Sequence, residues 1–259
     1  MKKEVSVAVA PIYSKPSFGS EMVTQALFLE IVSILEEKEN WKKIKLCDNY
    51  KGWIHSFYLD DILNFSNNYI FLTQRLTPLL SNNSLDSRIL NYLSFGTLVP
   101  MVDKDSHFYK IKLKDGRLAF IPFQSTPKYD NIRNEINRLA NVLLGVPYLW
   151  GGKSSLGYDC SGFIQMLLKA ANVTFPRDTK DQIRMKKLIK IDIGDAQPGD
   201  LLFFKKNNMV SHVALLAKDN QILHSSGEIK MESINQLDNN NSVYNLKKIC
   251  MSMSNYYNE

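Results

Sequence analysis

Cysteine is scarce in this sequence, which has three cysteines in 259 residues, at positions 47, 160 and 250. Their scattered spacing forms neither a disulfide framework nor the paired pattern of a structural zinc site. The chain is nevertheless 44% hydrophobic and 22% charged, so it can build the cores of two or three small domains. Any chemical role for a cysteine must therefore come from its local surroundings.

Long hydrophobic runs are also missing, and no stretch approaches the length of a membrane span. Lys2 and Lys3 imitate the start of a secretion signal, but the apolar run behind them is broken by Ser6 and stops at Pro11. We interpret this run as a β-strand at an intact cytosolic start. We therefore expect a cytoplasmic protein, or a periplasmic or secreted one if a signal had been removed.

Dense clusters of one charge are absent as well. The net charge is +6 and the sequence pI is about 9.0, but the basic residues are spread out in short pairs such as Lys186 and Lys187. This spread favours a solvated basic surface, with weak attraction to an anionic polymer, over a nucleic-acid binding site. We expect no nucleic acid among the partners.

The front half contains a repeat. Residues 31–54 align without a gap with residues 98–121, so that the motif KIKL recurs 67 residues later. Trp41 is matched by Phe108, and Trp53 by Phe120. Apolar residues alternate in both copies and turn-forming residues follow them, which predicts short strands in two small barrels.

The first copy, with LEEKENWKKIKL followed by GWIHSFYL, resembles a bacterial SH3 domain. The second copy keeps the core pattern but has Ala119 and Phe120 in place of Gly52 and Trp53, so it resembles a degenerate SH3 domain. One departure is Leu29, which stands where glycine commonly precedes the glutamate of the apolar strand. It affects the expected geometry of that loop and not the identity of the domain.

A linker follows the repeat at Pro127, and Asp130 or Asn131 can cap the helix behind it. Apolar residues between positions 132 and 143 fall on one helical face, and Gly145 fits the end of the helix. We therefore expect three domains, at residues 1–64, 65–127 and 128–259.

Cys160 follows the glycine-rich segment WGGKSSLG, in the first turn of a second predicted helix that begins near Asp159. Asp159 or Ser161 can cap its N–H groups. Unpaired N–H groups and the helix dipole favour a thiolate at this place, and the same groups can form an oxyanion hole. The alternative is an ordinary small core residue.

Histidine is scarce too, with four in the chain. His55 and His107 lie in the front copies, whereas His212 and His224 each follow a β pattern in the back half. Taken singly, a strand histidine is more often structural than catalytic. Together with Cys160, however, the two can supply a base and an orienting group for a nucleophile.

This hypothesis requires a specific hairpin register. Pairing of Ala217 with Gln221 leaves a three-residue loop, Lys218–Asn220, and places His212 and His224 on the same face. A two-residue loop would place the two histidines on opposite faces and exclude a joint role.

Five motifs then occur in order: GVPYLWGG, YDCSGF, QPGDLLFF, SHVALL and ILHSSG. This series resembles the NlpC/P60 cysteine peptidases from about Ile132 to the C-terminus. The resemblance implies a papain-like domain, with helices packed on an antiparallel sheet, whose catalytic residues are Cys160, His212 and His224. A zinc site formed by the same three residues is the alternative, and it lacks a fourth ligand at a recognisable spacing. The fold class expected for the whole chain is α+β, with two SH3-like barrels before the peptidase domain.

Two bacterial SH3 domains before the peptidase domain are similar to one subgroup, the γ-D-glutamyl-L-diamino acid endopeptidases that require a free N-terminal L-alanine. By this resemblance Asp178 binds the amine, Thr179 supplies a hydroxyl and Tyr148 hydrogen-bonds the catalytic sulfur. The other residues expected in the substrate pocket are Trp150, Asp159 and Ser161, with Glu21 and Tyr58 from the first SH3 domain. For Asp178, the alternative is helix capping.

The resemblance thus implies hydrolysis of the γ-D-glutamyl–diamino acid bond in peptidoglycan stem peptides, L-Ala-γ-D-Glu-diamino acid, in cell-wall peptide recycling. We expect a monomer that needs no cofactor and no metal. The alternatives are an exported hydrolase of the intact wall, a non-catalytic wall-peptide binding protein, and an acyltransferase or amidase of the same superfamily.

Overall fold

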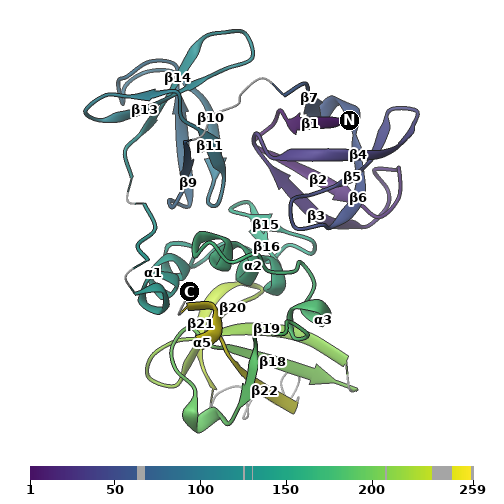
Figure 1. The fold of residues 1–259 in the computed structure, drawn as a ribbon, viewed down its shortest axis with the longest axis vertical. Coiled ribbons are helices and arrows are strands. Elements are labelled where there is room, and N and C mark those ends of the chain that lie inside the picture. The colour runs from purple at the N-terminus through teal and green to yellow at the C-terminus, as the bar shows by residue number, and fades with distance from the viewer. Residues whose placement is uncertain (63–67, 125, 130, 208, 235–246, 258–259) are drawn as a thin grey trace. The chain divides into compact units, whose positions relative to one another are not determined.

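The structure, a computed structural model, describes residues 1–62, 68–124, 126–129, 131–207, 209–234 and 247–257. Contacts divide the chain into two compact units, Met1–Pro127 and Lys128–Glu259 (Figure 1). The boundary predicted between residues 64 and 65 lies outside the described residues. Among the helices that the structure describes, none is long and apolar enough to cross a lipid bilayer.

The first barrel is a seven-stranded antiparallel sheet in the order β3-β2-β6-β5-β4-β1-β7. Its elements are β1 (Lys2–Val5), β2 (Val9–Tyr13), β3 (Met22–Leu27), β4 (Ile31–Lys38), β5 (Trp41–Lys45), β6 (Lys51–His55), η1 (Ser56–Tyr58) and β7 (Leu59–Asp60). The N-terminal run, predicted as one strand, is divided in two because β1 pairs with β4 and β7 whereas β2 pairs with β3 and β6. Pro11 lies within β2 and does not end the run.

The second barrel resembles the first, but its strands form a five-stranded sheet, β10-β9-β14-β13-β12, and a separate pair, β11-β8. Its strands are β8 (Tyr69–Phe71), β9 (Leu76–Leu80), β10 (Ile89–Ser94), β11 (Leu98–Pro100), β12 (Asp103–Lys104), β13 (Phe108–Lys112) and β14 (Leu118–Pro122). β9, β10, β13 and β14 each begin and end 67 residues after β2, β3, β5 and β6. The repeat predicted from KIKL is therefore confirmed, and it extends over the strands in front of that motif as well.

The loop at Leu29 keeps the geometry that a glycine would give it. Leu29 has a φ of 60°, and Gly96, its counterpart 67 residues later, has a φ of 81°. The left-handed region costs an L-residue with a side chain roughly 1–2 kcal/mol. Leu29 offsets part of this cost, because its side chain packs against the apolar cluster of the second barrel.

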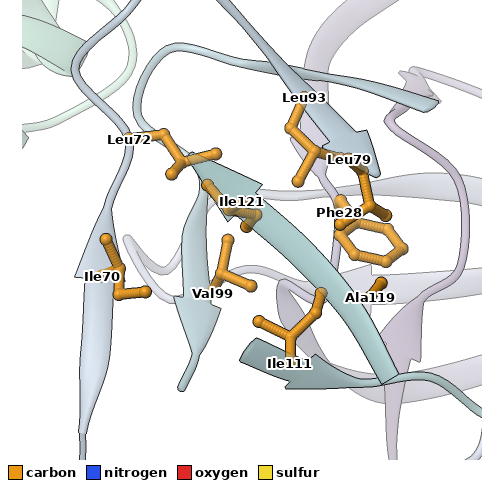
Figure 2. Close-up of a cluster of buried hydrophobic side chains, with 9 residues drawn as sticks. All are labelled: Phe28, Ile70, Leu72, Leu79, Leu93, Val99, Ile111, Ala119 and Ile121. Carbon is orange, nitrogen blue, oxygen red and sulfur yellow. The ribbon is translucent and has the colours of Figure 1, made fainter. Parts of the chain in front are cut away.

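That cluster lies between the strands of the second barrel (Figure 2). It consists of Phe28, Ile70, Leu72, Leu79, Leu93, Val99, Ile111, Ala119 and Ile121. Alternation along β13 and β14 directs Ile111, Ala119 and Ile121 inward, as expected of half-buried strands. Phe28 is supplied by the segment between β3 and β4 of the first barrel.

The second unit places helices over a six-stranded antiparallel sheet in the order β17-β22-β18-β19-β20-β21 (Figure 1). Its helices are α1 (Ile132–Val142), α2 (Cys160–Ala170), α3 (Thr179–Gln182), η2 (Ile193–Asp195) and α5 (Ser254–Tyr257). Its strands are β15 (Lys153–Ser154), β16 (Gly157–Tyr158), β17 (Ile189–Ile191), β18 (Leu201–Lys206), β19 (Met209–Leu216), β20 (Gln221–Ser226), β21 (Glu228–Ser233) and β22 (Lys247–Ser252). Helix α2 packs against both β19 and β20, and α1 packs against α2. The predicted α+β class, with barrels before a helix-on-sheet domain, is confirmed.

Helix α1 starts and stops where the sequence predicts. The Asn131 side chain accepts a hydrogen bond from the N–H of Asn134 at 3.0 Å, which caps the first turn. Gly145 has a φ of 78°, a conformation that glycine adopts without strain just past a helix end. The alternative cap, Asp130, lies outside the described residues.

Candidate active site

Cys160 is the first residue of α2, and Asp159 is its N-cap. The Asp159 carboxylate accepts the N–H of Gly162 at 2.7 Å and the hydroxyl of Ser161 at 3.1 Å. Its other oxygen accepts the N–H of Gly151 at 3.0 Å, which ties the glycine-rich segment to the helix start. The predicted capped first turn, with the cysteine inside it, is thus present.

Gly162 allows this close approach. A Cβ at position 162 would overlap the carbonyl oxygen of Gly152, so the helix start and the glycine-rich loop touch backbone to backbone. The same carbonyl accepts the N–H of Asp159 at 3.1 Å. The residues of the motifs WGG and DCSG are therefore packed tightly against each other, where the glycine-rich loop meets the start of α2.

Arg177 forms a buried ion pair with Asp159 at the start of α2. Its guanidinium holds both oxygens of Asp159, at 2.9 and 2.6 Å, and donates to the hydroxyl of Ser161 at 2.8 Å. Arg177 is 3% exposed and Asp159 is 7% exposed, so water screens this pair very little. Asp159 and Ser161 are thus engaged in internal hydrogen bonds, and their contact with substrate stays a prediction.

His212 lies on β19 and His224 on β20, and their rings meet. His212 Nε2 is 2.8 Å from His224 Nδ1. The hairpin has the predicted register, because Leu215 pairs with Leu223 and the N–H of Ala217 donates to the carbonyl of Gln221 at 2.8 Å. Asn220 has a φ of 56°, the left-handed conformation expected in a three-residue loop. The condition that the two histidines share a face is therefore met.

The cysteine meets this pair at β19. The backbone N–H groups of Val213 and Ser161 bond to the sulfur of Cys160, and Val213 is the residue after His212. The contact between α2 and β19 thus brings the nucleophile beside the candidate base. His212 uses Nε2 toward His224, so Nδ1 is the ring nitrogen that can serve the thiol.

Burial is the largest cause of the pKa shifts of this pair. Burial first, and then the charge of Asp159, raise the pKa of the Cys160 thiol to about 12, although the N–H groups of Val213 and Ser161 oppose this. Burial, and then His224, lower the pKa of His212 to about 3. The sequence predicts a favoured thiolate at the helix start. The structure instead indicates a neutral thiol beside a neutral imidazole.

This charge state predicts how Cys160 reacts with an alkylating agent. A thiol with a raised pKa is mostly protonated at neutral pH and gains thiolate as the pH rises. We therefore expect the rate of Cys160 alkylation by iodoacetamide, followed by mass spectrometry of its peptide, to keep rising above pH 9.

Cys47 is exposed and gives an internal comparison in the same samples. A resting thiolate–imidazolium pair would behave differently, with fast alkylation of Cys160 that is already constant between about pH 5 and 8. Such a plateau would contradict the neutral pair.

Asp178 and Thr179 begin α3, and both ends of this segment are fixed to the start of α2. Arg177 precedes them and binds Asp159, while the Gln182 side chain donates to the carbonyl of Ser161 at 3.0 Å. Asp178 occupies the N-cap position, but its side chain makes no capping hydrogen bond. Its carboxylate lies 3.5 Å from the Lys180 ammonium and is 31% exposed. The Asp178 carboxylate is therefore not used for helix capping. Its role as a ligand for the substrate amine stays a prediction.

Tyr148 and Trp150 lie in the loop before the glycine-rich segment. Burial, and then the negative charges that Cys160 and Asp159 can carry, raise the pKa of the Tyr148 hydroxyl to about 12. Trp150 is 62% exposed, in the turn before Gly151. Their contacts with substrate stay predictions.

Glu21 and Tyr58 belong to the first unit, in the first SH3 domain. The N–H of Ser14 donates to the carbonyl of Glu21 at 2.8 Å, and burial and the adjacent Tyr13 raise the pKa of Tyr58. Glu21 thus lies beside the residue that follows the end of β2. Their part in a substrate pocket stays a prediction.

Sequence reasoning missed three residues of this site: Arg177, Gln182 and Glu232. Glu232 Oε2 lies 2.9 Å from His224 Nε2, on the side of the ring away from His212. No local pattern pointed to Arg177, which meets Asp159 across 18 residues. Glu232 could have been found from the period-two pattern of a strand after Gly227, which was not predicted.

The zinc alternative finds no support in this geometry. Within the described ranges, no group of three or more His, Cys, Asp or Glu side chains is arranged to hold a metal ion. His212 and His224 point Nε2 and Nδ1 at each other, so these two nitrogens do not converge on a common cation.

Comparison with known families matches one segment in each half of the chain. Residues 145–249 match the family described as NlpC/P60, and residues 12–57 match the bacterial dipeptidyl-peptidase SH3 domain. Among solved structures, an NlpC/P60 family protein from Bacillus cereus superposes with a TM-score of 0.83 at 22% identity, covering 96% of this chain and 98% of that one. At this identity the likeness establishes the fold.

Two curated relatives extend over both halves. A γ-D-glutamyl-L-lysine dipeptidyl-peptidase from Bacillus cereus is 28% identical over 232 residues, covering 80% of this chain and 68% of the relative. Dipeptidyl-peptidase 6 from Lysinibacillus sphaericus is 27% identical over 264 residues, covering 94% of each. Residues 145–249 of this chain are an NlpC/P60 domain, and residues 12–57 are a bacterial SH3 domain.

Proposed function

We propose that this chain is a cysteine peptidase of bacterial cell-wall peptides, with Cys160 as nucleophile, His212 as base and His224 as the group that orients it. The observation that carries the proposal is the meeting of β19 with α2. There the N–H of Val213 contacts the Cys160 sulfur while the ring of the preceding His212 is held by His224 at 2.8 Å. This is the order of roles that thiol hydrolases use.

The chemistry starts from the neutral pair. His212 Nδ1 takes the thiol proton as the sulfur attacks the substrate carbonyl, so that charge develops only during the reaction. Asp159 already uses the N–H groups of Gly162 and Phe163, and the N–H of Cys160 is the donor for the oxyanion. His212 then protonates the leaving amine, and water attacks the thioester to release the acid and restore the thiol.

The bond cleaved is the amide between the γ-carboxyl of D-glutamate and a diamino acid, in peptides that begin with a free L-alanine. Two observations support this substrate. The two curated relatives are named as dipeptidyl-peptidases, one of them for γ-D-glutamyl-L-lysine. Asp178 presents a carboxylate that helix capping does not use, and a free amine of the substrate can replace Lys180 as its partner.

Requirement for a free amine restricts the enzyme to peptides released from the wall, as in cytoplasmic recycling of stem peptides. We therefore expect cleavage of soluble peptides and none of intact sacculi. Cleavage of sacculi would instead favour an exported wall hydrolase. Binding of the peptides without turnover would favour a non-catalytic binding protein.

Asp178→Asn tests the amine site. The variant keeps the size of the side chain but loses the charge, and a hydrogen bond to a charged group contributes about 1.5–3 kcal/mol. We therefore expect kcat/KM for L-Ala-γ-D-Glu-diaminopimelate to fall by about 10–100-fold. For the N-acetylated peptide we expect poor cleavage by the wild type and little further change in the variant.

Asp181→Asn is the matched control, because Asp181 is an exposed aspartate on the same short helix. We expect it to keep wild-type kcat/KM on both peptides. Equal cleavage of the free and the acetylated peptide by the wild type would rule out the amine requirement, whatever the variants do.

A further inference from the structure

The hydrogen-bond chain of the site does not end at His224. His224 Nδ1 meets His212, and His224 Nε2 lies 2.9 Å from Glu232 Oε2 on β21. The second oxygen of Glu232 is 2.7 Å from the Lys230 ammonium. His224 is fully buried, and the Glu232 side chain is 26% exposed, so this series of hydrogen bonds leads from the buried site toward the surface.

Strand pairing places these groups on one face of the sheet. In the β20–β21 ladder His224 is opposite Lys230, and Ile222 is opposite Glu232. Because residues two apart on a strand share a face, Lys230 and Glu232 both lie on the face of His224, with Glu232 in the diagonal position. The register of β20 and β21 therefore determines the contact between His224 and Glu232.

The proton positions follow from the chemistry of each group. A carboxylate only accepts hydrogen bonds, so His224 must donate through Nε2–H to Glu232. A neutral imidazole then has its lone pair on Nδ1, so His224 accepts at Nδ1 and His212 must donate through Nε2–H. His212 is left with its lone pair on Nδ1, the nitrogen that serves the thiol.

Glu232 itself stays ionised in this position. Burial opposes its charge, but the hydrogen bond from Lys230 and the neighbouring His224 hold the pKa of the Glu232 carboxyl below its usual value. Burial also lowers the pKa of His224, despite the nearby Glu232. A neutral ring between a carboxylate and a second ring is thus the resting arrangement.

We propose that Glu232 is a positioning residue that selects the tautomers of both histidines, so that His212 presents a proton-accepting Nδ1 to Cys160. This inference rests on the proposed function for its effect on turnover, but the tautomers can be measured without substrate. The opposite assignment would put the proton of His224 on Nδ1 and its lone pair against the carboxylate. His212 would then carry its proton on Nδ1 and would be unable to accept the proton of the thiol.

The test combines histidine NMR with kinetics. In protein labelled with 15N-histidine, the two ring nitrogens of each of the four histidines report which one carries the proton. For the wild type we expect Nε2–H at both His212 and His224. For Glu232→Ala we expect the Nδ1–H form of His224 to appear. We expect kcat on the tripeptide to fall at least about 10²-fold with little change in KM.

Glu232→Gln separates position from charge. Its amide oxygen can still accept from His224 Nε2–H, so we expect wild-type tautomers and a loss of kcat of about tenfold. Glu228→Ala is the matched control, because Glu228 is an exposed glutamate at the other end of β21, and we expect no change in either readout. Should Glu232→Ala fail to fold, Glu232→Gln carries the decision by its tautomers and its kcat.

Two results would overturn the inference. One is an unchanged pair of tautomers in Glu232→Ala, which would make any loss of turnover a structural effect. The other is a changed tautomer with full turnover, which would make the selection irrelevant to catalysis. Failure of the wild type to cleave the tripeptide would reject the proposed function instead, while the NMR measurement would still decide the tautomers.

Discussion

Replacing Cys160 by alanine is expected to reduce kcat on the stem tripeptide by about 10⁴-fold or more, because no thioester can form. Cys160→Ser is expected to be nearly as inactive. A neutral imidazole whose pKa is lowered to about 3 is a weak base, and a serine hydroxyl is a far weaker acid than a thiol. Turnover is measured as release of the diamino acid, by chromatography and mass spectrometry.

Cys47→Ala is the control for this prediction, because Cys47 is an exposed cysteine in the first SH3 domain. We expect it to keep wild-type kcat. Retention of more than about a hundredth of the activity in Cys160→Ala would exclude Cys160 as the nucleophile, since loss of a nucleophile typically costs far more.

Arg177→Ala is expected to destabilise the domain by about 3–5 kcal/mol, because it leaves the Asp159 carboxylate buried without its cation. The Arg177 side chain is 2% exposed and that of Asp159 is 10% exposed, so solvent cannot replace the lost partner. The orphaned charge would also raise the pKa of Cys160 further, since Asp159 already raises it and Arg177 lowers it. Urea unfolding measures the first effect, and the pH dependence of Cys160 alkylation in the folded fraction measures the second.

The double variant Asp159→Asn with Arg177→Met removes both charges together. We expect it to be more stable than Arg177→Ala, since a buried pair costs most when only one partner is removed. Arg184→Ala, an exposed arginine seven residues further on, is the control and should change the free energy of unfolding by less than about 0.5 kcal/mol. Equal destabilisation by Arg177→Ala and Arg184→Ala would show that the ion pair contributes nothing to stability.

Local patterns were sufficient to predict the barrels and the hairpin. Alternation of apolar residues and a constant spacing located the two copies of the barrel, because the strand period and the turn positions both depend on residues close together in the sequence. The same reasoning identified which register of the hairpin between β19 and β20 the triad requires, since the face of each histidine depends on parity alone. Cys160 could be placed at a helix start because its cap, Asp159, is the preceding residue.

Contacts between distant segments were not predictable from these patterns. Arg177 meets Asp159 across 18 residues, because the fold places the residue before the N-cap of α3 beside the start of α2. Glu232 lies on the strand after Gly227; alternation there could have predicted the strand, but not its contact with His224. The charge state of Cys160 also depends on packing, because burial raises the pKa of its thiol more than the N–H groups of Val213 and Ser161 lower it.

The most direct test is the reaction of the purified wild-type protein with L-Ala-γ-D-Glu-diaminopimelate, with the products identified by mass spectrometry. We predict the dipeptide L-Ala-D-Glu and free diaminopimelate, from the wild type and not from Cys160→Ala. Cleavage between alanine and glutamate, no cleavage by the wild type, or equal turnover by Cys160→Ala would contradict the proposed mechanism and substrate.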